Sequence, residues 1–180
     1  MDSYFLGIDP SATSTGVSLI GSNSHEVLNI KPRTLKGCLR LQYIHQELKD
    51  FIDNKLVYMG VIEAPSYGSV HKEFILGEVL GVIKLTLIQK DIFSLSIPPT
   101  QIKKFLTSKG HAGKDLMIQK AQEFGCPSSQ EDICDSWAAA LLCKGILLTS
   151  PITTRPALET IKSIKTKYKT DLVKLLNKKT

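Results

Sequence analysis

The chain has 180 residues, of which 42% are hydrophobic and 22% are charged, as is typical of one domain with a full hydrophobic core. Its longest apolar stretch, residues 137–149, is interrupted by Lys144 and is too short to span a bilayer. The first residues do not form the basic and apolar pattern of a signal peptide, and the four cysteines form no CxxC pair. We therefore expect a reducing intracellular compartment, and we expect the cysteines to be small core residues.

The formal net charge of +6 is unevenly distributed along the chain. Residues 151–180 contain eight lysines and arginines against two acids, which accounts for the whole excess and leaves residues 1–150 neutral. A basic segment after a neutral domain favours a polyanionic partner, such as nucleic acid or an acidic membrane surface.

The apolar pattern predicts the elements in chain order. Alternating or continuous apolar runs predict five strands, over residues 3–9, 16–21, 25–31, 57–63 and 92–97. Apolar residues at helical spacing predict helices over residues 36–55, 71–90, 100–107, 115–124 and 130–148. This order predicts an α/β domain with a single mixed five-stranded sheet and helices on both of its faces.

Two of the helical segments have features that bear on function. The helix over 71–90 is apolar nearly all round, so we expect it to be heavily buried, and Gly77 and Gly81 lie one turn apart on it, where another backbone could approach closely. After a break at residues 150–151, a last helix carries lysines on one side and an apolar stripe formed by Ile161, Ile164, Tyr168, Leu172 and Leu175. We therefore divide the chain into a domain over 1–150 and a basic helical extension over 151–180.

Four carboxylates have settings that suit metal binding. Asp9 and Glu63 each end an apolar strand and precede a helix breaker, while Asp132 and Asp135 lie three residues apart on a predicted helix and therefore share a face. The apolar helix after Asp135 argues against simple solvation, because buried carboxylates need a partner. Four oxygen ligands without a competing Cys/His set predict a site for Mg²⁺ or Mn²⁺.

A second group of residues suits phosphate. Lysines cluster with Gly110 and Gly113 in the segment over residues 103–114, where glycine allows close backbone approach and lysine adds charge. A solvated loop that carries lysines would have the same pattern. Tyr67 follows Glu63 on a loop and could stack on an unpaired base or simply cover the edge of the core. The predicted nucleic-acid contacts are Tyr67, Lys104, Lys109, His111, Lys162, Lys165 and Lys169.

Five blocks of the sequence, in order and spacing, resemble the RuvC Holliday junction resolvases across about residues 4–148. The blocks are Gly7-Ile8-Asp9-Pro10-Ser11 with Thr15-Gly16, Ile62-Glu63, residues 76–82, Gln101-Ile102-Lys103-Lys104 through Gly113-Lys114, and residues 132–138. The resemblance implies an RNase H-like fold, a homodimer and divalent-metal cleavage of four-way DNA junctions.

The resemblance also implies roles for individual residues. Asp9, Glu63, Asp132 and Asp135 fall on the family's catalytic acids, Lys103 and Lys114 fall on its basic active-site lysines, and the helix of Gly77 and Gly81 falls on its dimer-forming helix. We expect two Mg²⁺ ions in each active site, with Mn²⁺ as a substitute, and branched DNA as the partner rather than a membrane.

The sequence departs from the bacterial pattern at three places. Ser11 replaces the usual glycine, Ser66 stands where the bacterial enzymes carry phenylalanine, and the basic extension has no counterpart. This compact form with an added tail resembles phage-encoded or organellar members, so the expected location is the cytoplasm, including a host cytoplasm, or an organelle matrix.

The predicted function is a magnesium-dependent, structure-selective DNA endonuclease that resolves four-way junctions by paired incisions. One alternative is an RNase H-like nuclease that acts on flaps, forks or structured RNA. Another is a non-catalytic junction-binding protein, which four acids facing phosphates would disfavour.

Overall fold

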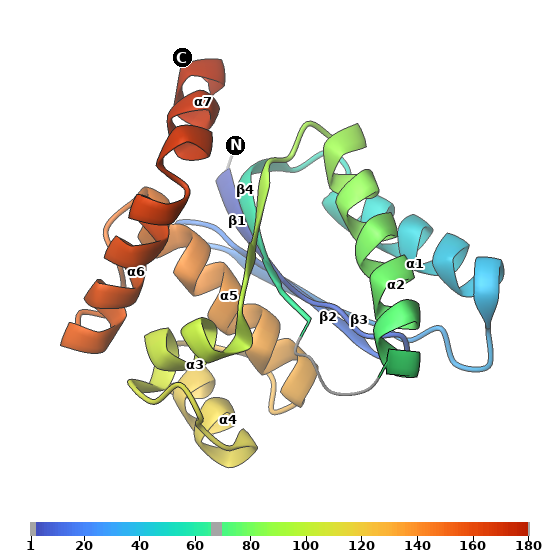
Figure 1. Ribbon diagram of the computed structural model, residues 1–180, viewed down its shortest axis with the longest axis horizontal. Helices are drawn as coiled ribbons and strands as arrows, with labels where there is room; N and C mark the ends of the chain where they lie inside the picture. The colour runs from blue at the N-terminus through green and yellow to red at the C-terminus, as the bar shows by residue number, and fades with distance from the viewer. Residues whose placement is uncertain (1–2, 66–69, 180) are drawn as a thin grey trace.

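The computed structural model describes residues 3–65 and 70–179, and a five-stranded mixed sheet lies at its centre (Figure 1). The strands are β1 (Ser3–Asp9), β2 (Thr15–Ile20), β3 (His25–Ile30), β4 (Leu56–Glu63) and β5 (Ser94–Ile97). Their order across the sheet is β3-β2-β1-β4-β5, with antiparallel β1–β2 and β2–β3 pairs and parallel β1–β4 and β4–β5 pairs. The predicted α/β class and the five strands are confirmed.

Helices cover both faces of the sheet. The helices are α1 (Gly37–Ile52), α2 (Val70–Gln89), α3 (Pro99–Thr107), α4 (Lys114–Glu123), α5 (Glu131–Leu147), α6 (Arg155–Lys167) and α7 (Lys169–Lys179). Figure 1 shows α1 and α2 on one side of the sheet, and α5 on the other side with α3, α4 and α6 around it. Each face therefore has its own hydrophobic core.

The alternation of side chains along the strands determines which residues face α5. On β1, Leu6 and Ile8 belong to the core under α1 and α2, whereas Phe5 belongs to the core under α5. On β4, Val61 faces α5 and Ile62 faces the opposite side. Because side chains alternate with a period of two, Asp9 and Glu63 continue the α5 side of their strands.

Two glycines allow α5 to approach the sheet closely. A Cβ atom at Gly7 would lie 2.0 Å from the carbonyl oxygen of Ser136 and 2.3 Å from the nitrogen of Ala140. A Cβ atom at Gly16 would lie 1.9 Å from the carbonyl oxygen of Asp132. These contacts are with backbone atoms that cannot rotate away, so any larger residue at either position would push the helix off the sheet.

The structure corrects the prediction that the helix over 71–90 is heavily buried. Within this single chain, Val79 and Ile83 are fully buried, but Phe74 is 72% exposed, Leu85 54% and Ile88 70%. Side chains added at Gly77 and Gly81 would meet no atom within 4 Å. The apolar residues of this segment lie on both faces of helix α2, and the rest of the chain covers only one of these faces.

The predicted last helix is in fact two helices. Helix α6 ends at Lys167, and Tyr168 has a non-helical backbone (φ −106°, ψ 22°) from which α7 begins. The hydroxyl of Tyr168 donates a hydrogen bond to the carbonyl oxygen of Ser96 at 3.0 Å, which holds the break against β5. The apolar stripe packs on the body of the same chain, because Ile161, Ile164, Leu172 and Leu175 are buried in the core under α5.

Two further findings concern the composition-based expectations. Three of the cysteines are buried, as expected of core residues, but Cys38 is exposed. Among the described residues, no helix is long and apolar enough to cross a membrane.

Candidate active site

Asp9 and Glu63 end the two neighbouring parallel strands β1 and β4. Ile8 is paired with Ile62 in this ladder, so the two acids come next on adjacent strands and on the same face. In the antiparallel direction Asp9 is paired with Gly16, over which the backbone of Asp132 lies. The carboxyl end of the central strand is therefore close to the first turn of α5.

Helix α5 brings Asp132 and Asp135 to this edge. Both lie within its first turns, where the positive end of the helix dipole favours carboxylates. The residues between them, Ile133 and Cys134, are buried, so this end of the helix is held rigidly while the two acids face the strand ends. Asp9, Glu63, Asp132 and Asp135 are called the acid cluster below.

Burial, and then repulsion between the acids, raises the pKa values of Asp9, Glu63 and Asp135. Burial raises the pKa of Asp9 to about 9, with further contributions from the negative charges of Glu63 and Asp135, and then of Asp132 and Glu131. Burial and the charge of Asp135 raise the pKa of Glu63 to about 7. Burial also raises the pKa of Asp135 to about 6. Asp9 is the member on which the repulsion from all the others converges.

Asp132 is held by side chains from the hairpin beside α5. Its Oδ2 atom accepts hydrogen bonds from the hydroxyl of Ser14 at 2.5 Å and from Nδ2 of Asn29 at 3.3 Å. Neither partner was predicted from the sequence. Both come from segments more than 100 residues earlier in the chain, so no local spacing connects them with Asp132.

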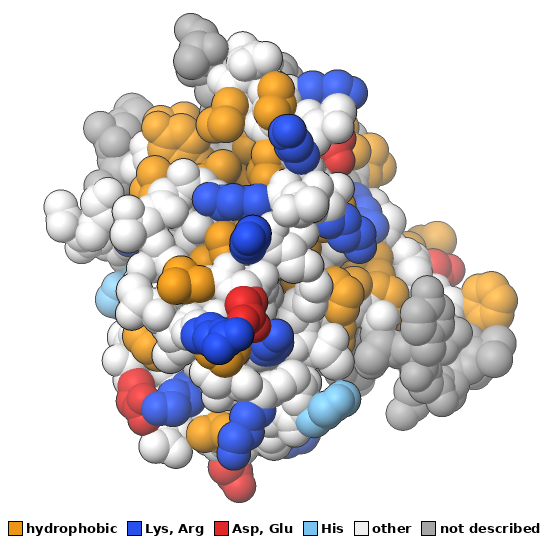
Figure 2. All heavy atoms as spheres, turned by 60° about the vertical axis from the view of Figure 1, so that its left-hand side comes forward, with side chains coloured by type: hydrophobic (Ala, Val, Ile, Leu, Met, Phe, Trp, Pro, Cys, Tyr) orange, Lys and Arg blue, Asp and Glu red, His pale blue; other side chains and the backbone are white. Residues whose placement is uncertain are grey.

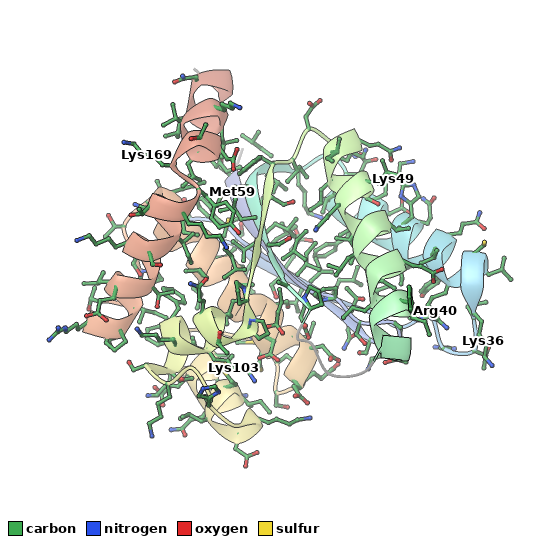
Figure 3. All side chains as sticks on the ribbon, in the orientation of Figure 1. Lys36, Arg40, Lys49, Met59, Lys103 and Lys169 are labelled. Atoms are coloured by element: carbon green, nitrogen blue, oxygen red, sulfur yellow. The ribbon has the colours of Figure 1, made fainter. Side chains whose placement is uncertain are left out.

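Lys103 provides positive charge next to the cluster. Its attraction lowers the pKa values of Glu63 and Asp135, against the effect of burial. A hollow of about 400 Å³ opens beside Glu63, with Lys103, Gly110 and His111 in its lining. Figure 3 labels Lys103 on α3, on the side of the sheet that carries α5.

Lys114 lies near the cluster but already has a partner. Its Nζ atom is 2.8 Å from Oε2 of Glu131, and this hydrogen bond raises the pKa of the lysine. The Lys114 side chain is 73% exposed, so the pair sits at the rim of the site. Glu131 is a fifth acid of this region, and the sequence analysis did not predict it. The signal that could have identified it is its place directly before Asp132 in the sequence.

The remaining predicted contacts are distributed around this rim. Lys109 and His111 are exposed on the loop between α3 and α4. Lys104 lies 3.6 Å from Oε2 of Glu159, so it links α3 to α6. Tyr67 lies outside the described residues.

The three lysines predicted in the extension, Lys162, Lys165 and Lys169, are called the tail lysines below. All three are exposed, and they line a shallow hollow of about 600 Å³ on α6 and the start of α7. Figure 2 brings this side of the molecule forward and shows Lys and Arg side chains gathered along the middle of the face. Lys169 is labelled in Figure 3 on the same side of the sheet as Lys103.

The donor set of the acid cluster fits a hard divalent cation. Among the described residues, no three Asp, Glu, His or Cys side chains already converge as a compact ligand cage. The cluster nevertheless concentrates carboxylate oxygens, since burial and then the neighbouring negative charges raise the pKa of Asp9, and a bound cation would offset this repulsion. Oxygen ligands without a cysteine or histidine among them are those that Mg²⁺ and Mn²⁺ prefer.

Comparison with known proteins shows the family to which the chain is similar. The model of the family described as crossover junction endodeoxyribonuclease RuvC matches residues 5–143. The protein of that name from Hydrogenovibrio crunogenus is 33% identical over 147 residues, which cover 76% of this chain and 84% of the relative. The one from Carboxydothermus hydrogenoformans is 28% identical over 144 residues, which cover 75% of this chain and 91% of the relative.

The fold is also that of a solved structure. The structure of T. thermophilus RuvC in complex with a Holliday junction substrate aligns with a TM-score of 0.65 at 20% identity, covering 78% of this chain and 90% of that one. This likeness confirms the predicted RNase H-like fold. The family match spans β1 to α5 and thus all four residues of the acid cluster. The chain belongs to the family of crossover junction endodeoxyribonucleases named RuvC.

Proposed function

We propose that this chain is an endonuclease that resolves four-way DNA junctions, and that the acid cluster is its active site. The observation that carries the proposal is that Asp9 and Glu63, at the ends of adjacent strands, lie near enough to Asp132 and Asp135 on α5 for their charges to interact. These four acids lie within the part of the chain that matches the RuvC family.

Divalent metal ions are the cofactor that suits this site. We assign two Mg²⁺ ions to the cluster, with Mn²⁺ as a substitute. Asp9 would contribute to both, since it is the acid that interacts with the other three, while Glu63 would serve one ion and Asp135 with Asp132 the other. Such ions supply an activated water and stabilise the negative charge on the leaving oxygen.

The chain's own cations would act on the DNA phosphates. Lys103 is poised beside Glu63 and Asp135, where its charge would offset the negative charge that builds up on the scissile phosphate. Lys114 would exchange Glu131 for a phosphate oxygen when DNA arrives, because both are anionic acceptors at the rim. Lys109 and His111, both exposed on the neighbouring loop, would contact the backbone further out, and Tyr67 would stack on a base near the junction centre.

A homodimer is the assembly that a four-way junction requires, because two active sites must address two strands related by two-fold symmetry. Helix α2 is the surface that suits it. Phe74, Leu85 and Ile88 are more than half exposed on this helix, and Gly77 and Gly81 leave room for another backbone. Exposed apolar side chains of this size on one helix are typical of a protein interface.

The extension over 151–180 would bind a DNA arm. Its buried stripe fixes α6 and α7 to the same core as the nuclease domain over 1–150, so the tail lysines have a defined position. Glu159 pairs with Lys104 and with Arg155, and none of the tail lysines forms an ion pair with it. Contacts of lysine with phosphate add affinity without base specificity.

A panel of substrates tests the proposed function. The purified chain should nick a four-way junction in Mg²⁺ at symmetric positions on two strands, and should cut linear duplex, flap, fork and RNA hairpin substrates far more slowly. Preferential cutting of flaps, forks or RNA would favour a nuclease of the same fold with another substrate. Tight junction binding without any cutting in Mg²⁺ or Mn²⁺ would indicate a non-catalytic binding protein.

A further inference from the structure

Asp132 differs from the rest of the acid cluster in how it is held. It is the member of the cluster that accepts hydrogen bonds from other side chains within the described part of the chain. Ser14 lies in the turn between β1 and β2, and Asn29 lies on β3, so the donors come from two elements on the same side of α5. Both donors reach the same carboxylate oxygen, Oδ2.

The two donors are also in contact with each other and with the start of α5. The hydroxyl of Ser14 lies 2.8 Å from Oδ1 of Asn29, and its single proton is donated either to this atom or to Asp132, while Nδ2 of Asn29 donates to Oε1 of Gln130 at 2.9 Å. Gln130 is the residue that precedes α5, so the network ties the β1–β2 turn and β3 to the start of the helix. The two Nδ2 protons of Asn29 are thus directed to Gln130 and Asp132, which fixes the direction from which Asn29 meets Asp132.

We propose that Ser14 and Asn29 are positioning residues that hold one oxygen of Asp132 so that the other is presented to the metal. This inference rests on the proposed function of the acid cluster. Asp132 repels Asp9, and without neutral donors this repulsion would turn its carboxylate outward toward water. A carboxylate that is held in place beforehand loses less freedom when a cation binds, so its ligand strength is greater.

The competing explanation is purely structural, since the same hydrogen bonds would also fasten β3 to α5. The two explanations differ in what a mutation changes. A positioning role predicts weaker metal binding in a protein of normal stability, and removal of the partners around a metal ligand typically lowers metal affinity about 10- to 100-fold. A structural role predicts lower stability in EDTA with metal affinity unchanged in the folded fraction.

The sharpest test compares Ser14→Val with Ser14→Thr, because these variants have nearly the same shape and differ in the hydroxyl donor. Calorimetric titration of the full chain with Mn²⁺, without DNA, should give an affinity about 10- to 100-fold lower for Ser14→Val than for the wild type. Ser14→Thr should retain most of the wild-type affinity. Asn29→Ala should resemble Ser14→Val, and the exposed residues of the β2–β3 loop provide the matched controls Ser22→Ala and Asn23→Ala.

A second measurement separates this inference from the proposed function. In junction cleavage, Ser14→Val should need more Mg²⁺ for half-maximal rate, and its rate should recover toward that of the wild type at saturating Mg²⁺. Equal Mn²⁺ affinities for Ser14→Val, Ser14→Thr and the wild type would overturn the positioning role even if the wild type resolves junctions. A selective loss of Mn²⁺ affinity in Ser14→Val would support it even if the natural substrate is another branched DNA.

Discussion

Asp9 should destabilise the metal-free protein as the pH rises. Its pKa in the folded chain is raised from the ordinary 3.8 to about 9, so over this range the unfolded chain releases a proton that the folded chain retains. The group therefore contributes most to stability below pH 4, and the contribution is lost as the pH rises toward 9. Each pH unit in this window costs about 1.4 kcal/mol, so the step from pH 5 to pH 8 costs about 4 kcal/mol.

Replacement of Asp9 by Asn removes this dependence while it keeps the shape of the side chain. In EDTA, the stability of Asp9→Asn relative to the wild type should rise by about 4 kcal/mol between pH 5 and pH 8, or roughly 10 °C in melting temperature for a chain of this length. Addition of Mg²⁺ at pH 8 should stabilise the wild type more than Asp9→Asn, because Asp9 can release its proton and become a charged ligand, whereas the amide cannot.

Thermal unfolding in EDTA between pH 5 and pH 8 measures this difference. Asp50→Asn is the matched control, since Asp50 is an exposed aspartate on α1, on the other side of the sheet from α5. The reasoning would be refuted if Asp9→Asn and the wild type lost stability equally between pH 5 and pH 8.

Three further predictions concern the frame of the site, the dimer and the tail. Gly16→Ala should lower the free energy of unfolding by at least about 1–3 kcal/mol and should also impair cutting, because its Cβ would meet the backbone of Asp132. In the control Gly60→Ala the Cβ would meet side-chain atoms at 3.4 Å, so its effect in unfolding and cleavage assays should be mild. Gly81→Leu should shift the protein toward monomer in sedimentation and uncouple the two nicks, and a wild type that is monomeric yet makes paired incisions would contradict this. Alanine at all three tail lysines should weaken junction binding. The slope of log affinity against log salt concentration should become shallower by nearly one for each phosphate that is no longer neutralised. The control Lys36→Ala with Lys49→Ala, on the α1 side, should leave the slope as it is, and an unchanged slope in the tail variant would exclude the tail as a DNA-binding surface.

The core of the site could be predicted from local sequence. Asp9 and Glu63 each follow an apolar strand and precede a breaker, and the spacing of Asp132 and Asp135 places them on one helical face. Strand alternation and helical periodicity are local rules, so a short stretch of sequence was sufficient for each of them. The structure adds the reason why these segments meet, which is the absence of a side chain at Gly16.

The features that could not be predicted depend on contacts between distant segments. The donors to Asp132 come from a turn and a strand that no periodicity connects with α5. The break at Tyr168 depends on a hydrogen bond to Ser96 on a different element, while the apolar stripe runs through it without interruption. An apolar residue such as Phe74 on α2 indicates a surface that is buried in the functional protein. The sequence pattern does not show whether that surface is buried by the same chain or by a second chain.

The central claim is that the acid cluster cuts the junction, and the most direct test measures cutting and binding in the same variants. Asp9→Asn, Glu63→Gln and Asp135→Asn each remove a carboxylate without adding bulk. Each variant should bind a four-way junction in Ca²⁺ with near wild-type affinity, while its cleavage rate in Mg²⁺ should fall by about two orders of magnitude or more. A folded Asp9→Asn or Glu63→Gln protein that still resolves junctions at close to the wild-type rate would contradict the account.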